Sequence, residues 1–189
     1  MKPAHSLLTI TLAFTITAVI WSCGTKEAPA PEDENELITT VRLTFTEDGT
    51  TTPQKFEWKD LDGDGGNAPT TSRITLKASR SYKVDVEFLD ESKTPTDNIT
   101  DEVREEGDEH LVVLTPTPSS LFTYTASDKD SRNFPIGLSG TVATGSINQG
   151  LLRLQLRHQP PVNGQSVKNG TVAPGSDDVN ITFDVVVAP

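Results

Sequence analysis

From residue 37 onward, apolar and polar residues alternate with a period of two, which is the spacing of a half-buried β-strand. The segment LITTVRLTFT at 37–46 places Leu37, Val41 and Phe45 on one face. The final segment alternates in the same way and is apolar enough to lie inside a sheet. We therefore predict strands at 37–46, 55–58, 73–78, 81–89, 110–115, 121–126, 138–144, 151–158 and 179–188.

Gly, Pro, Asn and Asp separate these segments. Short strands at this density favour an all-β fold, an Ig-like or Greek-key β-sandwich of roughly seven to nine strands. One short surface helix is predicted at 99–106, with Thr100 as its cap and little more than Ile99 and Val103 to bury. Tight connections at 47–49 and 78–81 predict two hairpins.

The first 22 residues have the layout of a secretory signal, with Lys2, an apolar run over 7–20, and Ser22 directly before Cys23. The apolar run is shorter than the about 20 residues that a membrane-spanning helix needs. A small residue followed by cysteine resembles a bacterial lipoprotein signal, although Trp21 departs from the usual small or aliphatic residue. The resemblance implies cleavage before Cys23 and lipidation of that cysteine, palmitate being the expected acyl group.

Cys23 is the only cysteine of the chain, so a disulfide framework is excluded. The segment GTKEAPAPEDENE at 24–36 is acidic, contains prolines and has almost no apolar surface to bury. We assign 1–22 to a lipoprotein signal peptide, 23–36 to the lipidated cysteine with a disordered acidic tether, and 37–189 to the β-sandwich domain.

The chain has a net charge of −11, which argues against nucleic acid as a partner and against binding anionic head groups by charge. Lys26 and Glu27, with the acidic residues that follow, resemble the export signal of Bacteroidetes surface lipoproteins. This resemblance implies a lipid-anchored, surface-exposed protein on the outer membrane.

The string DLDGDG, which begins at Asp60, satisfies the opening of the EF-hand pattern. Alternate aspartates can turn hard carboxylate oxygens toward one cation, and calcium is the ion that such a loop takes. The bidentate Glu of an EF-hand is replaced by Thr71 and the flanks are strands, so a true EF-hand is excluded. Either Asp60, Asp62, Asp64 and Asn67 form a β-loop calcium site, or the loop is a solvated turn.

His110 and His158 are the only histidines after the leader. His158 ends an alternating strand, on the face that carries its leucines. If the two strand ends meet, the imidazoles could form a metal site with Asp62, Asp64 or Glu109, and such ligands suit zinc, copper or iron. In the competing interpretation, each histidine is merely hydrogen-bonded at a strand end.

The sequence contains no G-x-S-x-G elbow, P-loop or H-E-x-x-H motif. A dispersed Ser–His–Asp set or a carboxylate pair stays open, because their members can be far apart in sequence. No residue points to either arrangement, and one of the two tryptophans lies in the leader. We predict that the protein is not an enzyme and has no catalytic or cofactor-binding residues.

Several stretches together carry a family resemblance: ITTVRLTFT, WKDLDGDGGNAP, NITDEVREEGDEH, IGL, LRHQP and VNITFDV. In this order they resemble a family of small Bacteroidetes surface lipoproteins of unassigned function. Members are sometimes labelled type 1 periplasmic binding fold proteins, which implies an α/β architecture that the strand pattern contradicts. The resemblance implies the location and supplies neither an activity nor ligand residues.

We therefore expect an outer-membrane-anchored lipoprotein that acts as a binding or accessory module. Its expected partners are the membrane, through the lipid, and an outer-membrane receptor protein. One alternative is a metal-binding lipoprotein that holds calcium or a transition metal. The other is a purely structural envelope protein.

Overall fold

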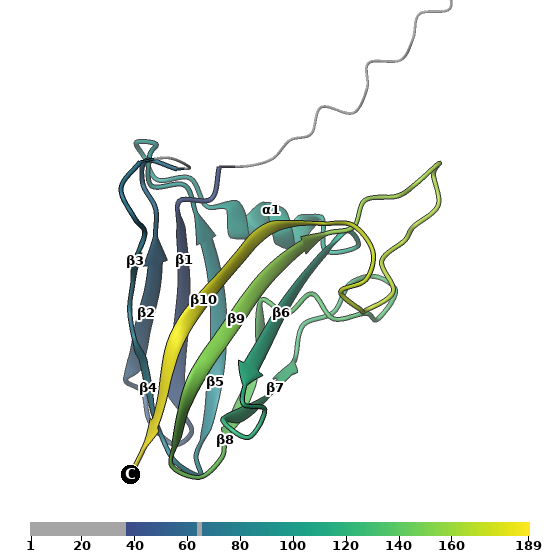
Figure 1. Ribbon diagram of the computed structural model, residues 1–189. Coiled ribbons are helices and arrows are strands. Elements are labelled where there is room, and N and C mark those ends of the chain that lie inside the picture. Colours follow the sequence, from purple (N-terminus) through teal and green to yellow (C-terminus); the bar gives the residue numbers. More distant parts are fainter. Residues whose placement is uncertain (1–36, 64–65) are drawn as a thin grey trace, which may run out of the picture. The chain divides into compact units, whose positions relative to one another are not determined.

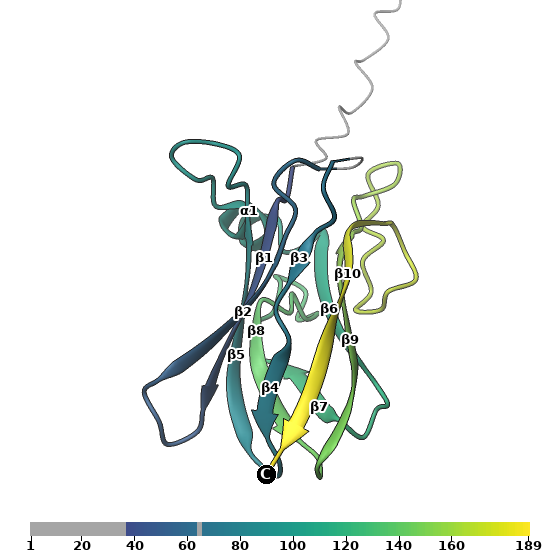
Figure 2. The same cartoon turned by 60° about the vertical axis from the view of Figure 1, so that its left-hand side comes forward.

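Two β-sheets pack face to face (Figures 1 and 2). Their inward-pointing apolar side chains form the core between them. The computed structural model describes residues 37–63 and 66–189, which fall within the unit Asn35–Pro189. The predicted signal peptide, Cys23, the tether and Asp64 lie outside the described residues. Within the described ranges, no helix is long and apolar enough to span a membrane.

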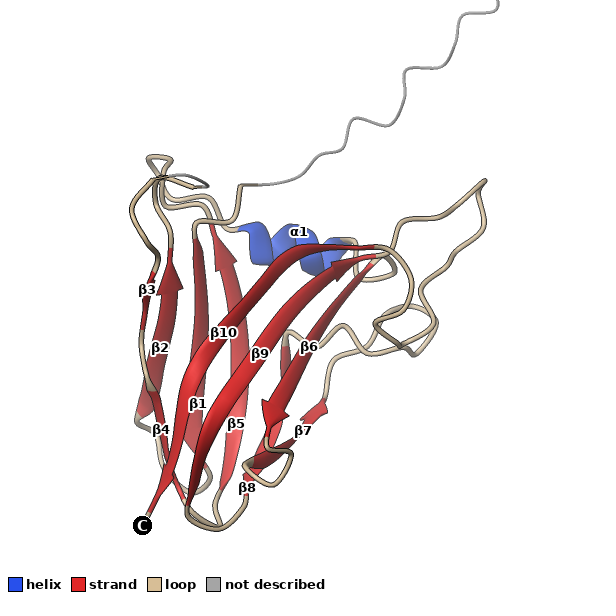
Figure 3. Ribbon diagram, in the orientation of Figure 1, coloured by secondary structure: helices blue, strands red, loops and turns tan. Residues whose placement is uncertain are grey.

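Within this described part of the chain, the elements follow one another as one short helix among ten strands (Figure 3). Their bounds are β1 Thr40–Glu47, β2 Pro53–Lys59, β3 Thr70–Thr71, β4 Ile74–Lys77, β5 Ser81–Leu89, α1 Ile99–Glu105, β6 His110–Thr117, β7 Phe122–Ala126, β8 Ser139–Thr144, β9 Asn148–His158 and β10 Ser176–Ala188. The six-stranded sheet has the order β3-β2-β1-β5-β8-β7, and the four-stranded sheet has the order β4-β10-β9-β6. The predicted all-β sandwich is confirmed.

The core consists of the residues that the alternation placed on the inner faces. Phe45 on β1, Phe88 on β5 and Phe183 on β10 are fully buried. Leu152, Leu154 and Leu156 follow one another along the inner face of β9. Burying each such side chain stabilises the fold by about 1.5–3 kcal/mol. This stabilisation determines which face of each strand points into the core.

All nine predicted strands are present, and the two-residue β3 was not foreseen. The turn at 47–49 forms the predicted hairpin, with Gly49 at a φ of 80°. The hairpin predicted at 78–81 is wrong, because β4 and β5 belong to different sheets. At this corner the Ala78 N–H donates to Ala188 of β10, while the Ser79 N–H donates to Gly145 after β8. The connection therefore crosses from one sheet to the other.

Helix α1 carries the chain from β5 in one sheet to β6 in the other, at one end of the sandwich (Figure 1). Ile99 and Val103 are buried, as predicted. The predicted cap is wrong: Asn98 is the N-cap residue, and the Thr100 hydroxyl bonds the backbone of Phe88 instead. After α1 a tight turn leads directly into β6.

Candidate metal centre

The two histidines predicted from strand ends lie opposite each other on neighbouring antiparallel strands. His110 is the first residue of β6 and pairs with His158, the last residue of β9. The next inward-facing pairs along the same two strands are Val112 with Leu156 and Leu114 with Leu154. The imidazole rings stack, with centroids 4.9 Å apart and planes 8° from parallel. The pairing thus places both imidazoles at the end of the core, in line with its apolar side chains.

A third side chain reaches the histidines through a β-bulge in β10. Asp177 pairs with Arg157 and Val179 pairs with Leu156, so Asp178 is an extra residue in the ladder. Asp177 turns to the outer face, where its carboxylate bonds the guanidinium of Arg157 at 2.6 Å. Asp178 turns toward the histidines. This is a common consequence of a bulge, which changes the direction of a side chain without breaking the sheet.

The three side chains offer ligand atoms that all lie within 4.8 Å of one another. His110 Nε2 lies 3.8 Å from Asp178 Oδ2, and His158 Nδ1 lies 4.0 Å from Asp178 Oδ1. Ligand atoms around a tetrahedral zinc ion are about 3.3 Å apart, given metal–ligand bonds of about 2.0–2.1 Å. A bound ion would therefore draw each ring nitrogen and the carboxylate oxygen that faces it together by roughly 0.5–0.7 Å.

The remaining nitrogen of each ring faces an oxygen on the far side from Asp178. His110 Nδ1 lies 3.2 Å from the backbone carbonyl oxygen of Glu106, in the turn after α1. The carbonyl can only accept, so Nδ1 is the protonated nitrogen of a neutral His110. His158 Nε2 lies 3.9 Å from the carboxylate of Glu109. Metal-binding histidines commonly have such an oxygen behind the ring.

The surroundings keep His110 neutral at physiological pH. Its side chain is 9% exposed, and burial, followed by the neighbouring His158, lowers its pKa to about 4. Burial also raises the pKa of the Asp178 carboxyl. A bound cation would oppose that rise, because it favours the charged carboxylate. A neutral imidazole is the form that binds metal, so His110 has its lone pair free at pH 7.

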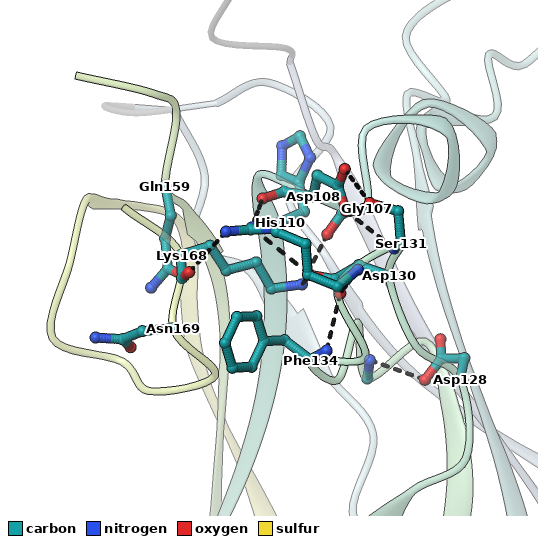
Figure 4. Close-up of polar contacts among 12 residues, drawn as sticks. Gly107, Asp108, His110, Asp128, Asp130, Ser131, Phe134, Gln159, Lys168 and Asn169 are labelled. Carbon is teal, nitrogen blue, oxygen red and sulfur yellow. Dashed lines mark hydrogen bonds and ion pairs between the residues drawn. The ribbon is translucent and has the colours of Figure 1, made fainter. Parts of the chain in front are cut away.

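Close to His110, a buried ion pair fixes the turn from which β6 begins (Figure 4). The Lys168 Nζ donates to the Gly107 carbonyl at 2.7 Å and lies 3.0 Å from Asp130 Oδ2. Both charged side chains are fully buried. The other Asp130 oxygen accepts the N–H groups of Arg132 and Phe134. We call Lys168, Asp130, Arg132 and Asp108 the clamp.

The clamp joins the β7–β8 loop (127–138) and the β9–β10 loop (159–175) to the turn after α1. Arg132 donates to the Asp108 carbonyl at 2.7 Å and to the Lys168 carbonyl at 3.1 Å. The Asp108 carboxylate accepts from the backbone and hydroxyl of Ser131. Gly175 then brings the chain back to β10, at a φ of 75° and so close to His158 that a Cβ would overlap its carbonyl oxygen. These contacts hold His110 and Asp178 beside His158.

The structure places the predicted loop aspartates elsewhere. Asp62 Oδ2 accepts from both the backbone N–H and the side-chain amide of Asn67, at 2.9 and 2.7 Å, and so closes its own loop. Asp64 lies outside the described residues, and Asp60 is the first residue of the loop, directly after β2. Among the described residues, the one group of three metal-ligand side chains within 4.8 Å contains neither Asp60 nor Asp62.

Sequence reasoning brought the two histidines and Glu109 together and missed Asp178. The alternation begins at Val179, so the predicted strand at 179–188 leaves Asp177 and Asp178 in the loop before it. A bulge inserts one residue without disturbing the period on either side, and periodicity therefore cannot reveal it. Two adjacent aspartates just before a strand were the available signal.

The donor set of two imidazoles and one carboxylate suits Zn²⁺, Cu²⁺, Ni²⁺ or Fe²⁺ better than Ca²⁺ or Mg²⁺. Three protein ligands leave one position of a tetrahedral ion open to water or to a further ligand. Comparisons of the chain with family models, curated proteins and solved structures found no match. The assignment of this site therefore rests on the geometry of its own side chains.

Replacing Lys168 should show that the clamp acts as a unit. We expect Lys168→Met to lower the free energy of unfolding by about 3–5 kcal/mol, because it leaves the Asp130 carboxylate buried without its partner. Asp130→Asn should cost a similar amount, and the double variant should cost clearly less than the sum. Urea denaturation of the three variants measures this, and strictly additive losses would contradict the coupling.

The metal-free protein should lose stability as the pH falls from about 6.5 to 4. In that range the unfolded state protonates His110 and the folded state does not, which gives up to about 3 kcal/mol from this group. Asp178 acts in the opposite direction, since its raised pKa lets the folded state bind a proton first. The ionisable groups that face His110 are His158, Asp178, Glu102, Glu106 and Lys168.

The measurement is chemical denaturation in EDTA at several pH values, for the wild type and for His110→Gln. The variant cannot titrate at this position, so its stability should fall less between pH 6.5 and 4. Parallel pH profiles would show that His110 titrates normally in the folded state.

Proposed function

We propose that this chain is an envelope-anchored protein that binds one transition-metal ion between His110, His158 and Asp178. The observation that carries the proposal is the convergence of these three side chains at the end of the core. They come from three neighbouring strands, β6, β9 and β10, so the backbone of one sheet sets their spacing. A metal-binding function was one of the alternatives expected from the sequence.

The distances are longer than those of a hydrogen-bonded salt bridge and leave room for an ion between the three side chains. A charged hydrogen bond between imidazole and carboxylate would bring nitrogen and oxygen to about 2.7–2.9 Å. Asp178 instead lies 3.8 and 4.0 Å from the two ring nitrogens that face it. Each of its two oxygens faces one histidine. A cation between the carboxylate and the two rings would therefore contact all three side chains.

The location in this proposal comes from the N-terminal sequence. The apolar run before Cys23 and the acidic tether after it support a lipid anchor, with the sandwich held beside the membrane. The open coordination position would let the protein hold an ion reversibly, as a binding or accessory module does.

Titration calorimetry on the full-length chain, purified without a polyhistidine tag, tests the metal site. We expect Zn²⁺ and Cu²⁺ to bind once per chain. His110→Gln and Asp178→Asn should each weaken binding by about tenfold or more, because each removes one ligand. Asp184→Asn, an exposed carboxylate of the same strand, is the matched control and should bind like the wild type.

Absence of heat at micromolar Zn²⁺ and Cu²⁺, or binding that both site variants retain, would refute the metal proposal. Calcium provides a separate comparison. Millimolar Ca²⁺ binding that Asp62→Asn abolishes would favour the aspartate loop as the metal site instead.

The lipid anchor is tested in cells. Radiolabelled palmitate should be incorporated into the wild-type chain and sediment with membranes. Cys23→Ala should lose the label, because it removes the cysteine that carries the acyl group. His158→Gln is the control and should keep the label. Labelling that persists in Cys23→Ala would refute the anchor and leave the metal site untouched.

A further inference from the structure

The two histidines present different ring nitrogens to Asp178. His110 faces it with Nε2, at 3.8 Å, and His158 faces it with Nδ1, at 4.0 Å. Because the two nitrogens of an imidazole point away from each other, the nitrogen on the far edge of each ring has a different neighbour. For His110 that neighbour is the Glu106 carbonyl, and for His158 it is the carboxylate of Glu109.

We propose that the ion binds Nε2 of His110 and Nδ1 of His158, and that Glu109 is a positioning residue that holds the Nε2–H of His158. This inference rests on the proposed function, since it concerns the same site. It also changes the role expected for Glu109, which the sequence had grouped with the metal ligands. Glu109 acts on the ion only through the imidazole of His158.

The backbone places Glu109 for this role. The Glu109 carbonyl accepts a hydrogen bond from the N–H of Gln159, the residue after His158, at 2.7 Å. The main-chain hydrogen bonds between β6 and β9 therefore continue one residue beyond the ends of these strands. Glu109 is therefore tied beside the end of β9. From there its carboxylate reaches Nε2 of His158, on the edge of the ring that faces away from Asp178. An ion on the Asp178 edge lies out of its reach.

The separation of 3.9 Å between Glu109 and His158 is longer than a hydrogen bond. The Glu109 side chain is about one-third exposed and has rotatable bonds that let its carboxylate approach the ring. A single water molecule can also bridge the two groups. When Nδ1 of His158 binds a metal ion, Nε2 must carry the proton of the neutral ring, and a carboxylate is a strong acceptor for it.

Nitrogen-15 NMR of the histidine rings in the Zn²⁺-loaded full-length chain tests the assignment directly. We expect His110 to be protonated at Nδ1 with zinc on Nε2, and His158 to be protonated at Nε2 with zinc on Nδ1. Binding through Nε2 of both rings would overturn the inference. Failure of the proposed function looks different, because the wild type would then bind no zinc.

Variants of Glu109 test its positioning role. We expect Glu109→Ala to weaken zinc binding by about 10–100-fold, as loss of an outer oxygen typically does. Glu109→Gln should weaken it less, because the amide oxygen still accepts the proton. Glu105→Gln, which neutralises an exposed acid at the end of α1, is the matched control for charge and should bind like the wild type.

Two readouts separate positioning from the other roles. In Glu109→Ala the histidine spectra should show His158 exchanging between tautomers in the metal-free protein, an effect that a merely structural role would not produce. If Glu109 were itself a ligand, Glu109→Gln would weaken zinc binding as much as Asp178→Asn does. That equality, or unchanged affinity in Glu109→Ala, would overturn the inference.

Discussion

The antiparallel pairing of β6 with β9 is the constraint on which the candidate site depends. His110 lies opposite His158 because Val112 lies opposite Leu156 and Leu114 opposite Leu154 further along the same strands. Side chains alternate between the two faces of a strand, so a slip of one residue would move a histidine to the outer face together with its leucines. The cost of exposing those leucines to water prevents the slip. The hydrophobic core thus fixes the register, and the register brings the two imidazoles together.

The third ligand depends on a different device, and the two support each other. The bulge turns Asp178 inward while Asp177 stays outside with Arg157, so two adjacent aspartates serve opposite faces of one sheet. Burying polar groups at the end of a core destabilises the fold unless they find partners. The clamp reduces that cost in the neighbouring turn, where Lys168 satisfies both the Gly107 carbonyl and the Asp130 carboxylate. The region around the histidines is therefore rigid through polar bonds, whereas the middle of the sandwich is rigid through packing.

The alternation of apolar residues was enough to predict the nine main strands, because one face of each strand is buried and the other is not. It also placed His158 correctly on the face of Leu152, Leu154 and Leu156. It could not show that β4 and β5 belong to different sheets, because a tight connection has the same residues in a hairpin and at a corner between sheets. The role of Thr100 was missed for a similar reason: its hydroxyl bonds Phe88, a residue distant in sequence. The sequence predicted that the two histidines would lie together if the ends of their strands met. It could not predict Asp178, because the bulge that turns this residue inward depends on how β10 pairs with β9.

The position of the site also determines how an ion would affect the protein. All three candidate ligands belong to adjacent strands of the four-stranded sheet, so an ion would cross-link β6, β9 and β10 at their shared end. The unfolded chain has no such arrangement, because His110 begins β6 and His158 ends β9, with β7, β8 and their connecting loops between these two strands. Binding to the folded state alone adds about 2.7 kcal/mol of stability when the free ion is at 100 times its dissociation constant. Beyond the apolar core, polar contacts replace side-chain packing. An ion that links the three strands would therefore stabilise this end of the sheet most. An ion at this site would therefore add its binding free energy to the polar contacts that already hold this end of the sandwich together.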